Sequence, residues 1–93
     1  MYAVIRNYAG NKELADQLAA RKDEVVALVS GIEGFQAYYL LRTDGGCASV
    51  TVYDDAAGAD ESVRVAREWM SDHAAEVNAT TPEVMSGEVV VDA

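Results

Sequence analysis

The sequence predicts an α+β fold whose elements follow the order β-α-β-β-α-β. Segments rich in β-branched and aromatic residues alternate with segments of helical periodicity, and a glycine turn joins two of the predicted strands. This order is typical of the ferredoxin-like arrangement, an antiparallel four-stranded sheet with both helices on one face. The length of 93 residues suits one domain, so we expect a single domain over residues 1–93.

A strand and a helix are predicted for the first third of the chain. Residues 2–8, YAVIRNY, contain β-branched and aromatic residues and stop before Gly10, as a strand does. A helical segment follows, and Gly31 and Gly34 mark its end. Its apolar residues fall on one side at about 100° per residue. They are Leu14, Leu18, Val25, Val29 and Ile32.

A hairpin, a second helix and a last strand are predicted for the rest of the chain. Residues 35–43 and 47–54 flank a short glycine turn and read as the two strands of the hairpin. The second helix is expected over about residues 56–78, with Asp54 or Asp55 as its N-cap. Residues 83–91 supply the last strand, and Gly87 predicts a bulge in it.

Both sides of the predicted strands carry apolar residues. The first strand places Ala3, Ile5 and Asn7 on one side and Tyr2, Val4, Arg6 and Tyr8 on the other. The second alternates Phe35, Ala37, Tyr39 and Leu41 with Gln36, Tyr38, Leu40 and Arg42. Two helices cover one face only, so we expect the other face to be covered by self-association, as a homodimer formed through the sheet.

Charge restricts the classes of partner. Sixteen acidic side chains against seven basic ones leave a formal net charge of -9, which repels phosphate backbones and anionic membrane surfaces. The sequence shows no leader segment and no apolar run long enough to span a bilayer. We therefore expect no nucleic-acid partner, no membrane partner and a cytoplasmic location.

Neither a metal site nor a cofactor is predicted. Cys47 and His73 are the only cysteine and histidine, so the ligands of a structural zinc site are missing. Glu68, Asp72 and Glu76 recur at four-residue steps on the second helix. Calcium sites draw their ligands from folded loops, so these carboxylates are interpreted as a solvated helix face.

The stretch REWMSDH contains the only tryptophan, Trp69, and the only histidine, His73, four residues apart. On a helix this spacing brings the two side chains together, at the flank of an apolar stripe. The stripe consists of Ala59, Val63, Ala66, Met70, Ala74 and Val77. A flanking Trp–His pair suits the wall of a ligand pocket and equally suits the edge of a packed core. Both interpretations stay open.

The basic residues also have two interpretations. Arg21 and Lys22 sit at the margins of the first helix's apolar stripe, where their stems can cover the core while the charge stays in water. Alternatively one of these two, or Arg6 or Arg42 from the strands, binds an anionic group of a ligand.

The chain resembles the dimeric α/β-barrel superfamily that includes the antibiotic biosynthesis monooxygenases and many small proteins without an assigned activity. The resemblance covers nearly the whole chain, through the element order, GFQAYYLLRT, SVTVYDD and REWMSDHAAEV. It implies that two sheets pair into a shared barrel and that each subunit binds a ligand between its sheet and its helices.

The resemblance also implies candidate site residues. The ligand-binding candidates are Asn7, Tyr38, Tyr39, Trp69, Met70 and His73. In a cofactor-independent monooxygenase acting on a phenolic substrate, His73 would act as base and Asn7 and Trp69 as oxyanion donors. A heme-degrading branch carries Asn, Trp and His on the same elements, but its histidine follows the tryptophan by more than one turn. The leading hypothesis is therefore a homodimer that binds a small apolar or aromatic ligand, with no assigned activity.

Overall fold

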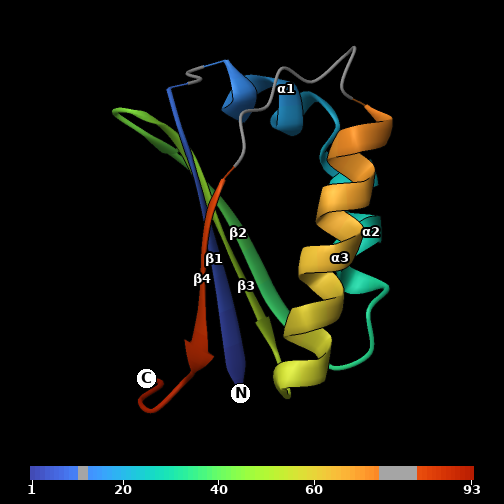
Figure 1. Cartoon of the computed structure of the whole chain (residues 1–93), viewed down its shortest axis with the longest axis vertical. Coiled ribbons are helices and arrows are strands. Elements are labelled where there is room, and N and C mark those ends of the chain that lie inside the picture. Colours follow the sequence, from blue (N-terminus) through green and yellow to red (C-terminus); the bar gives the residue numbers. More distant parts are fainter. Residues whose placement is uncertain (11–12, 74–81) are drawn as a thin grey trace.

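The computed structural model describes residues 1–10, 13–73 and 82–93. Its elements are β1 (Tyr2–Ala9), α1 (Leu14–Ala20), α2 (Lys22–Ser30), β2 (Phe35–Thr43), β3 (Gly46–Tyr53), α3 (Ala56–Asp72) and β4 (Glu83–Glu88). The strands form one antiparallel sheet in the order β2-β3-β1-β4. The three helices lie on one side of it and leave its other face without a helix (Figure 1). The predicted α+β fold class is confirmed.

The first predicted helix is in fact two helices. α1 and α2 are separated by Arg21, whose φ of -109° and ψ of 29° lie outside helical geometry. Leu14 and Leu18 of α1 and Val25 and Val29 of α2 are all buried. The break leaves the phase of the apolar residues unchanged, so their periodicity gave no sign of it.

The ends of α3 and β4 also differ from the prediction. Asp55 is the N-cap of α3 and accepts a hydrogen bond from the Gly58 N–H at 3.1 Å. α3 ends at Asp72, and the rest of the predicted helix, residues 74–78, lies outside the described residues. β4 ends at Glu88 because that residue pairs with Tyr2, the first residue of β1. The ladder between β1 and β4 is continuous through Gly87, so the bulge predicted there is wrong.

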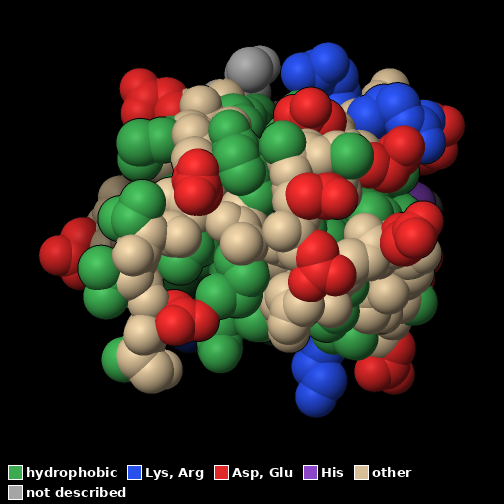
Figure 2. Space-filling view, turned by 90° about the horizontal axis from the view of Figure 1, so that it is seen from below, with side chains coloured by type: hydrophobic (Ala, Val, Ile, Leu, Met, Phe, Trp, Pro, Cys, Tyr) green, Lys and Arg blue, Asp and Glu red, His purple; other side chains and the backbone are tan. Residues whose placement is uncertain are grey.

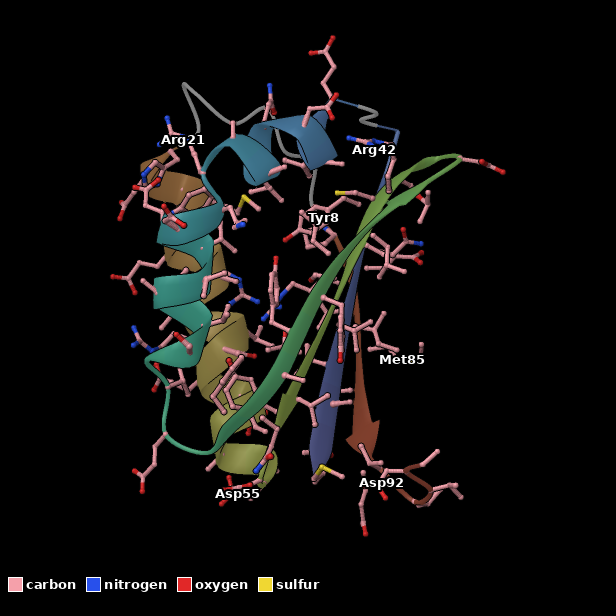
Figure 3. All side chains as sticks on the ribbon, turned by 180° about the vertical axis from the view of Figure 1, so that it is seen from behind. Tyr8, Arg21, Arg42, Asp55, Met85 and Asp92 are labelled. Carbon is pink, nitrogen blue, oxygen red and sulfur yellow. The ribbon has the colours of Figure 1, made fainter. Side chains whose placement is uncertain are left out.

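Antiparallel pairing fixes which side chains share a face, because residues directly opposite each other project to the same side. The face toward the helices, here called the inner face, holds the buried residues of β1: Val4, Arg6 and Tyr8. Figure 3 shows Tyr8 directed toward the helices and Met85 of β4 directed away from them. The opposite side is the outer face.

One residue of β2 leaves the predicted alternation. The register between β2 and β3 shifts between Phe35 and Ala37, so Phe35 pairs with Tyr53 instead of following the outer set. Phe35 packs against the buried cluster of Val4, Tyr53 and Ala59, and its ring meets that of Tyr53 edge-on at 6.0 Å. The irregular register therefore lets the Phe35 side chain pack against the core instead of facing solvent.

The buried core has two parts. One lies at the start of α3 and is formed by Val4, Tyr53 and Ala59. The other lies under α1 and α2. It is formed by Tyr8, Leu14, Ala15, Leu18, Val25 and Cys47. None of the described helices is long and apolar enough to span a membrane.

Candidate functional site

Between the two core clusters, the inner face of the sheet is polar. A row across all four strands places Leu40, Ser49, Arg6 and Val84 side by side on this face. In the next row, Thr51 lies between Val4 and Tyr38. The sheet therefore presents a guanidinium and two hydroxyls toward the helices.

Arg6 is the centre of this polar region. It is only 4% exposed, and its Nη2 donates to Ser62 Oγ of α3 at 3.2 Å. Ser62 in turn donates to the Ala59 carbonyl at 2.7 Å. No carboxylate of the described residues lies within ion-pair distance of Arg6. Burial lowers the pKa of Arg6, but a guanidinium stays protonated in proteins, so the region contains a buried positive charge.

Three tyrosines surround this charge. Tyr8, Tyr38 and Tyr53 all interact electrostatically with Arg6. Burial raises the pKa of Tyr38 to about 12 and also raises the pKa of Tyr8 and Tyr53, although Arg6 opposes these shifts. The three phenols are therefore neutral near pH 7, so each has an O–H to donate. Tyr53 donates to the Val29 carbonyl at 3.1 Å.

Thr51 adds an unused polar group. Its side chain is fully buried, and its Oγ1 has no hydrogen-bond partner among the described residues. A buried hydroxyl without a partner costs about 1–3 kcal/mol. Ser49, the residue opposite Arg6 on β3, is also buried. The inner face thus holds one buried hydroxyl, that of Thr51, which the described residues do not satisfy.

The predicted Trp69–His73 pair forms at the C-terminal end of α3. The two rings stack with their centroids 4.2 Å apart and an interplanar angle of 21°. Trp69 packs against the core cluster under α1 and α2, as Met70 does. His73 Nδ1 donates to the Trp69 carbonyl at 2.8 Å, and its Nε2 lies 3.6 Å from the exposed Glu24 carboxylate of α2. Trp69 is therefore part of the core's edge, and His73 faces α2.

The structure does not bring all the predicted site residues together. Tyr38, Trp69 and Met70 lie in the layer between sheet and helices. Asn7 is exposed on the outer face, in the row of Ala48 and Glu83, and Tyr39 is 63% exposed on the same face. Within one chain, Asn7 therefore lies on the opposite side of the sheet from Trp69. Side chains alternate along a strand, and Arg6 occupies the inner position next to Asn7.

Other charged residues pair at the surface. Arg42 pairs with Asp16 of α1, and Arg21 with Glu24 at 3.1 Å. Arg64 Nη1 pairs with Glu68 at 2.8 Å, consistent with a solvated face there. Acidic side chains are spread over the molecule's lower end, and the basic ones lie at the rim of that view (Figure 2). The described residues contain no cluster of His, Cys, Asp or Glu able to hold a metal ion.

The outer face is a mostly apolar surface. Tyr39, Val50, Ile5 and Met85 form an apolar row that crosses all four strands. A groove of about 730 Å³ opens on this face between Ile5, Asn7, Met85 and the β2–β3 turn. Ile5 is 36% and Met85 is 65% exposed. No described helix covers this surface.

Arg6 is more central than its place among four basic candidates indicated. It alternates with Val4 and Tyr8 along the strand and so had to share their face. Thr51 and Ser62 were not among the candidates, since isolated hydroxyl residues carry no motif. The usable signal was a charged residue inside a strand between two apolar positions.

Comparison with known proteins identifies the fold. No family model and no curated protein sequence matches this chain. Among solved structures, the heme-degrader MhuD from Mycobacterium tuberculosis, with two hemes bound in its active site, matches with a TM-score of 0.74 at 22% identity, covering 100% of this chain and 99% of that one.

Two further structures show the range of proteins that share the fold. SnoaB, a cofactor-independent oxygenase from Streptomyces nogalater, matches with a TM-score of 0.60 at 18% identity over 98% of this chain and 92% of its own. A protein of unknown function from Nitrosomonas europaea matches with a TM-score of 0.68 at 19% identity over 99% and 90%. The antibiotic biosynthesis monooxygenase-like fold expected from the sequence is thereby confirmed.

Proposed function

We propose that this protein is a homodimer that binds a small planar aromatic ligand between its sheet and its helices. The observation that carries the proposal is the buried polar region around Arg6. A layer built only for packing would not retain a charge without a carboxylate partner and a hydroxyl without a hydrogen-bond partner. The fold adds support, since structures that share it hold ligands such as heme in an active site.

The dimer is proposed to form through the outer face. Its rows are apolar apart from Asn7, Glu83 and Thr43, and Leu41 is 46% exposed at one edge. Exposed apolar surface of this extent is typical of an interface between subunits. This fold typically forms dimeric barrels, which join two sheets through this kind of surface. Light scattering should give about twice the chain mass of 9.9 kDa.

Ligand binding can be tested through Trp69, since it is the only tryptophan. A planar aromatic ligand in the sheet–helix layer should change the emission of Trp69 in a saturable way, because that side chain packs at the edge of this layer. The same titration with His73→Ala separates the roles of the stacked pair. If His73 contacts the ligand by one hydrogen bond, binding should weaken by about 0.5–1.5 kcal/mol. Unchanged emission with a broad set of flat ligands would refute the proposal.

A second candidate function is cofactor-independent monooxygenation of a phenolic substrate. The observation that favours it is the group of O–H and N–H donors around Arg6, which suits a developing oxyanion. Conversion of a substrate CH2 to a ketone by O2 releases one water and needs no added reductant. These donors differ from those expected from the sequence. Asn7 lies on the outer face, and Arg6 occupies the neighbouring inner position instead. Oxygen uptake with polycyclic phenols distinguishes this activity from binding alone.

Heme is a poorer fit to the residues present. Donation from His73 Nδ1 to a backbone carbonyl suits a metal-ligating histidine. However, Nε2, the nitrogen left for iron, faces the exposed Glu24 carboxylate instead of the sheet–helix layer. In a titration with heme, the absorption spectrum should therefore be the same for the unmodified protein and for His73→Ala.

A further inference from the structure

The buried guanidinium of Arg6 is an anomaly in a chain with an excess of acid. The chain has sixteen acidic and seven basic side chains. Arg6 is buried, yet it has no carboxylate partner among the described residues. The exposed Arg42 and Arg64 both form ion pairs. Leaving a charge buried and uncompensated costs several kcal/mol, so a purely structural residue here would be expected to be apolar or paired.

The hydrogen-bonding capacity around Arg6 is also one-sided. A guanidinium has five N–H donors, and the Arg6 side chain uses one of them, toward Ser62. Thr51 has an unpartnered hydroxyl in the neighbouring row, and the phenol of Tyr38, directly beside Thr51, is held neutral by burial. The region therefore offers hydrogen-bond donors but contains no negatively charged group to accept from them among the described residues.

Arg6 lies on β1, next to the edge strand β4. On β4, the residues that share its face are Val84, beside Arg6 and 45% exposed, and the exposed Ser86. Solvent therefore reaches the inner face as far as Val84, the residue directly beside the buried Arg6.

We propose that Arg6 selects ligands that carry an anionic oxygen on a planar aromatic frame, a carboxylate or an ionised phenol. The inference rests on the proposed ligand-binding function and narrows it to one chemical class. The guanidinium binds the anionic oxygen, Thr51 and Tyr38 supply neutral donors beside it, and the aromatic frame extends toward Trp69 and Met70, which border the same layer. Arg6 is thus the residue that determines specificity.

The test compares charged and uncharged ligands by isothermal titration calorimetry on the intact protein. The probes are 2-naphthoate, ionised 2,4-dinitro-1-naphthol and the uncharged methyl 2-naphthoate. Binding of one or both anions at least about tenfold tighter than the ester supports the proposal, and the ratio of the two anions tells carboxylate from phenolate. Equal affinity for anion and ester leaves the proposed function standing and overturns the role of Arg6. Absence of binding by all three overturns both.

Variants add a second, independent criterion. Arg6→Met should lose about 10- to 100-fold in anion affinity, keep its affinity for the ester and resist denaturant at least as well as the unmodified protein, because an unpaired buried charge is removed. Arg6→Lys should retain part of the anion preference. Arg64→Met changes the net charge equally at an exposed site and should leave all three affinities unchanged. Undiminished naphthoate binding by Arg6→Met overturns the proposal. If Arg6→Met does not fold, the anion–ester comparison in the unmodified protein decides.

Discussion

At the scale of single residues, the groups between sheet and helices differ in how readily they change charge. Arg6 keeps its charge over the accessible pH range, whereas the phenols beside it lose their protons only in alkali. Burial disfavours the phenolate, and Arg6 favours it; for Tyr38 burial is the larger effect. The site therefore keeps one fixed positive charge and neutral donors throughout the physiological range.

Stability should fall steeply in alkali. Because the pKa of Tyr38 is raised to about 12 in the folded chain, its contribution to stability is complete below its unfolded value, near pH 10. That contribution is lost as the pH rises from about 10 to 12. Denaturant titrations between pH 8 and about 11 should show this loss, and Tyr38→Phe should reduce its slope. If the free energy of unfolding of Tyr38→Phe depended on pH as steeply as that of the unmodified protein, the pKa of Tyr38 would not be raised by folding.

At the scale of elements, α3 is held to the sheet by close contact at its first turn. Gly58 is buried there, and a Cβ built on it would lie 3.0 Å from the Tyr53 side chain and 3.1 Å from the Glu33 carbonyl. Glycine weakens a helix, so helix propensity alone does not explain a glycine in the first turn of this one. The structure supplies the reason for the glycine, since a Cβ at this position would require the Tyr53 side chain or the helix to shift.

Gly58→Ala should therefore destabilise the protein although alanine is the better helix former. The gain in helix propensity is about 1 kcal/mol, and overpacking costs typically about 1–3 kcal/mol. We expect a net loss of about 1 kcal/mol in the free energy of unfolding, measured by urea titration. Gly45→Ala is the control, because a Cβ at that position meets nothing within 4 Å. A Gly58→Ala variant more stable than the parent would show that the first turn of α3 packs more loosely.

At the scale of the whole molecule, the strand patterns predicted the fold but not the orientation of the sheet. The alternation along β1 grouped Arg6 with Val4 and Tyr8 correctly, yet both sides of that strand carry apolar residues, so nothing in the pattern showed which side faces the helices. The candidate site consequently mixed the two faces by joining Asn7 to Trp69. The register shift at Phe35 likewise depends on contact with Tyr53, which is distant in sequence.

Salt should strengthen the proposed dimer. Each chain carries a formal net charge of -9, so association brings like charges together. Raising the ionic strength from about 0.02 to 0.2 M shortens the screening length to less than about 10 Å and weakens this repulsion. Sedimentation at low protein concentration should give a smaller dissociation constant at the higher salt. The opposite trend would indicate that the interface is held mainly by ion pairs.

The location of the interface can be tested by placing a charge on the outer face. Ile5 lies in the apolar row between Val50 and Met85, so Ile5→Lys would bury an ammonium group without a partner if two outer faces meet. Light scattering should then report a folded monomer of about 9.9 kDa. Val26→Lys is the matched control, since Val26 is an apolar residue of α2, 44% exposed on the helical side. It should remain dimeric. If Ile5→Lys stays dimeric while Val26→Lys dissociates, the chains associate through their helices and the apolar sheet face needs another partner.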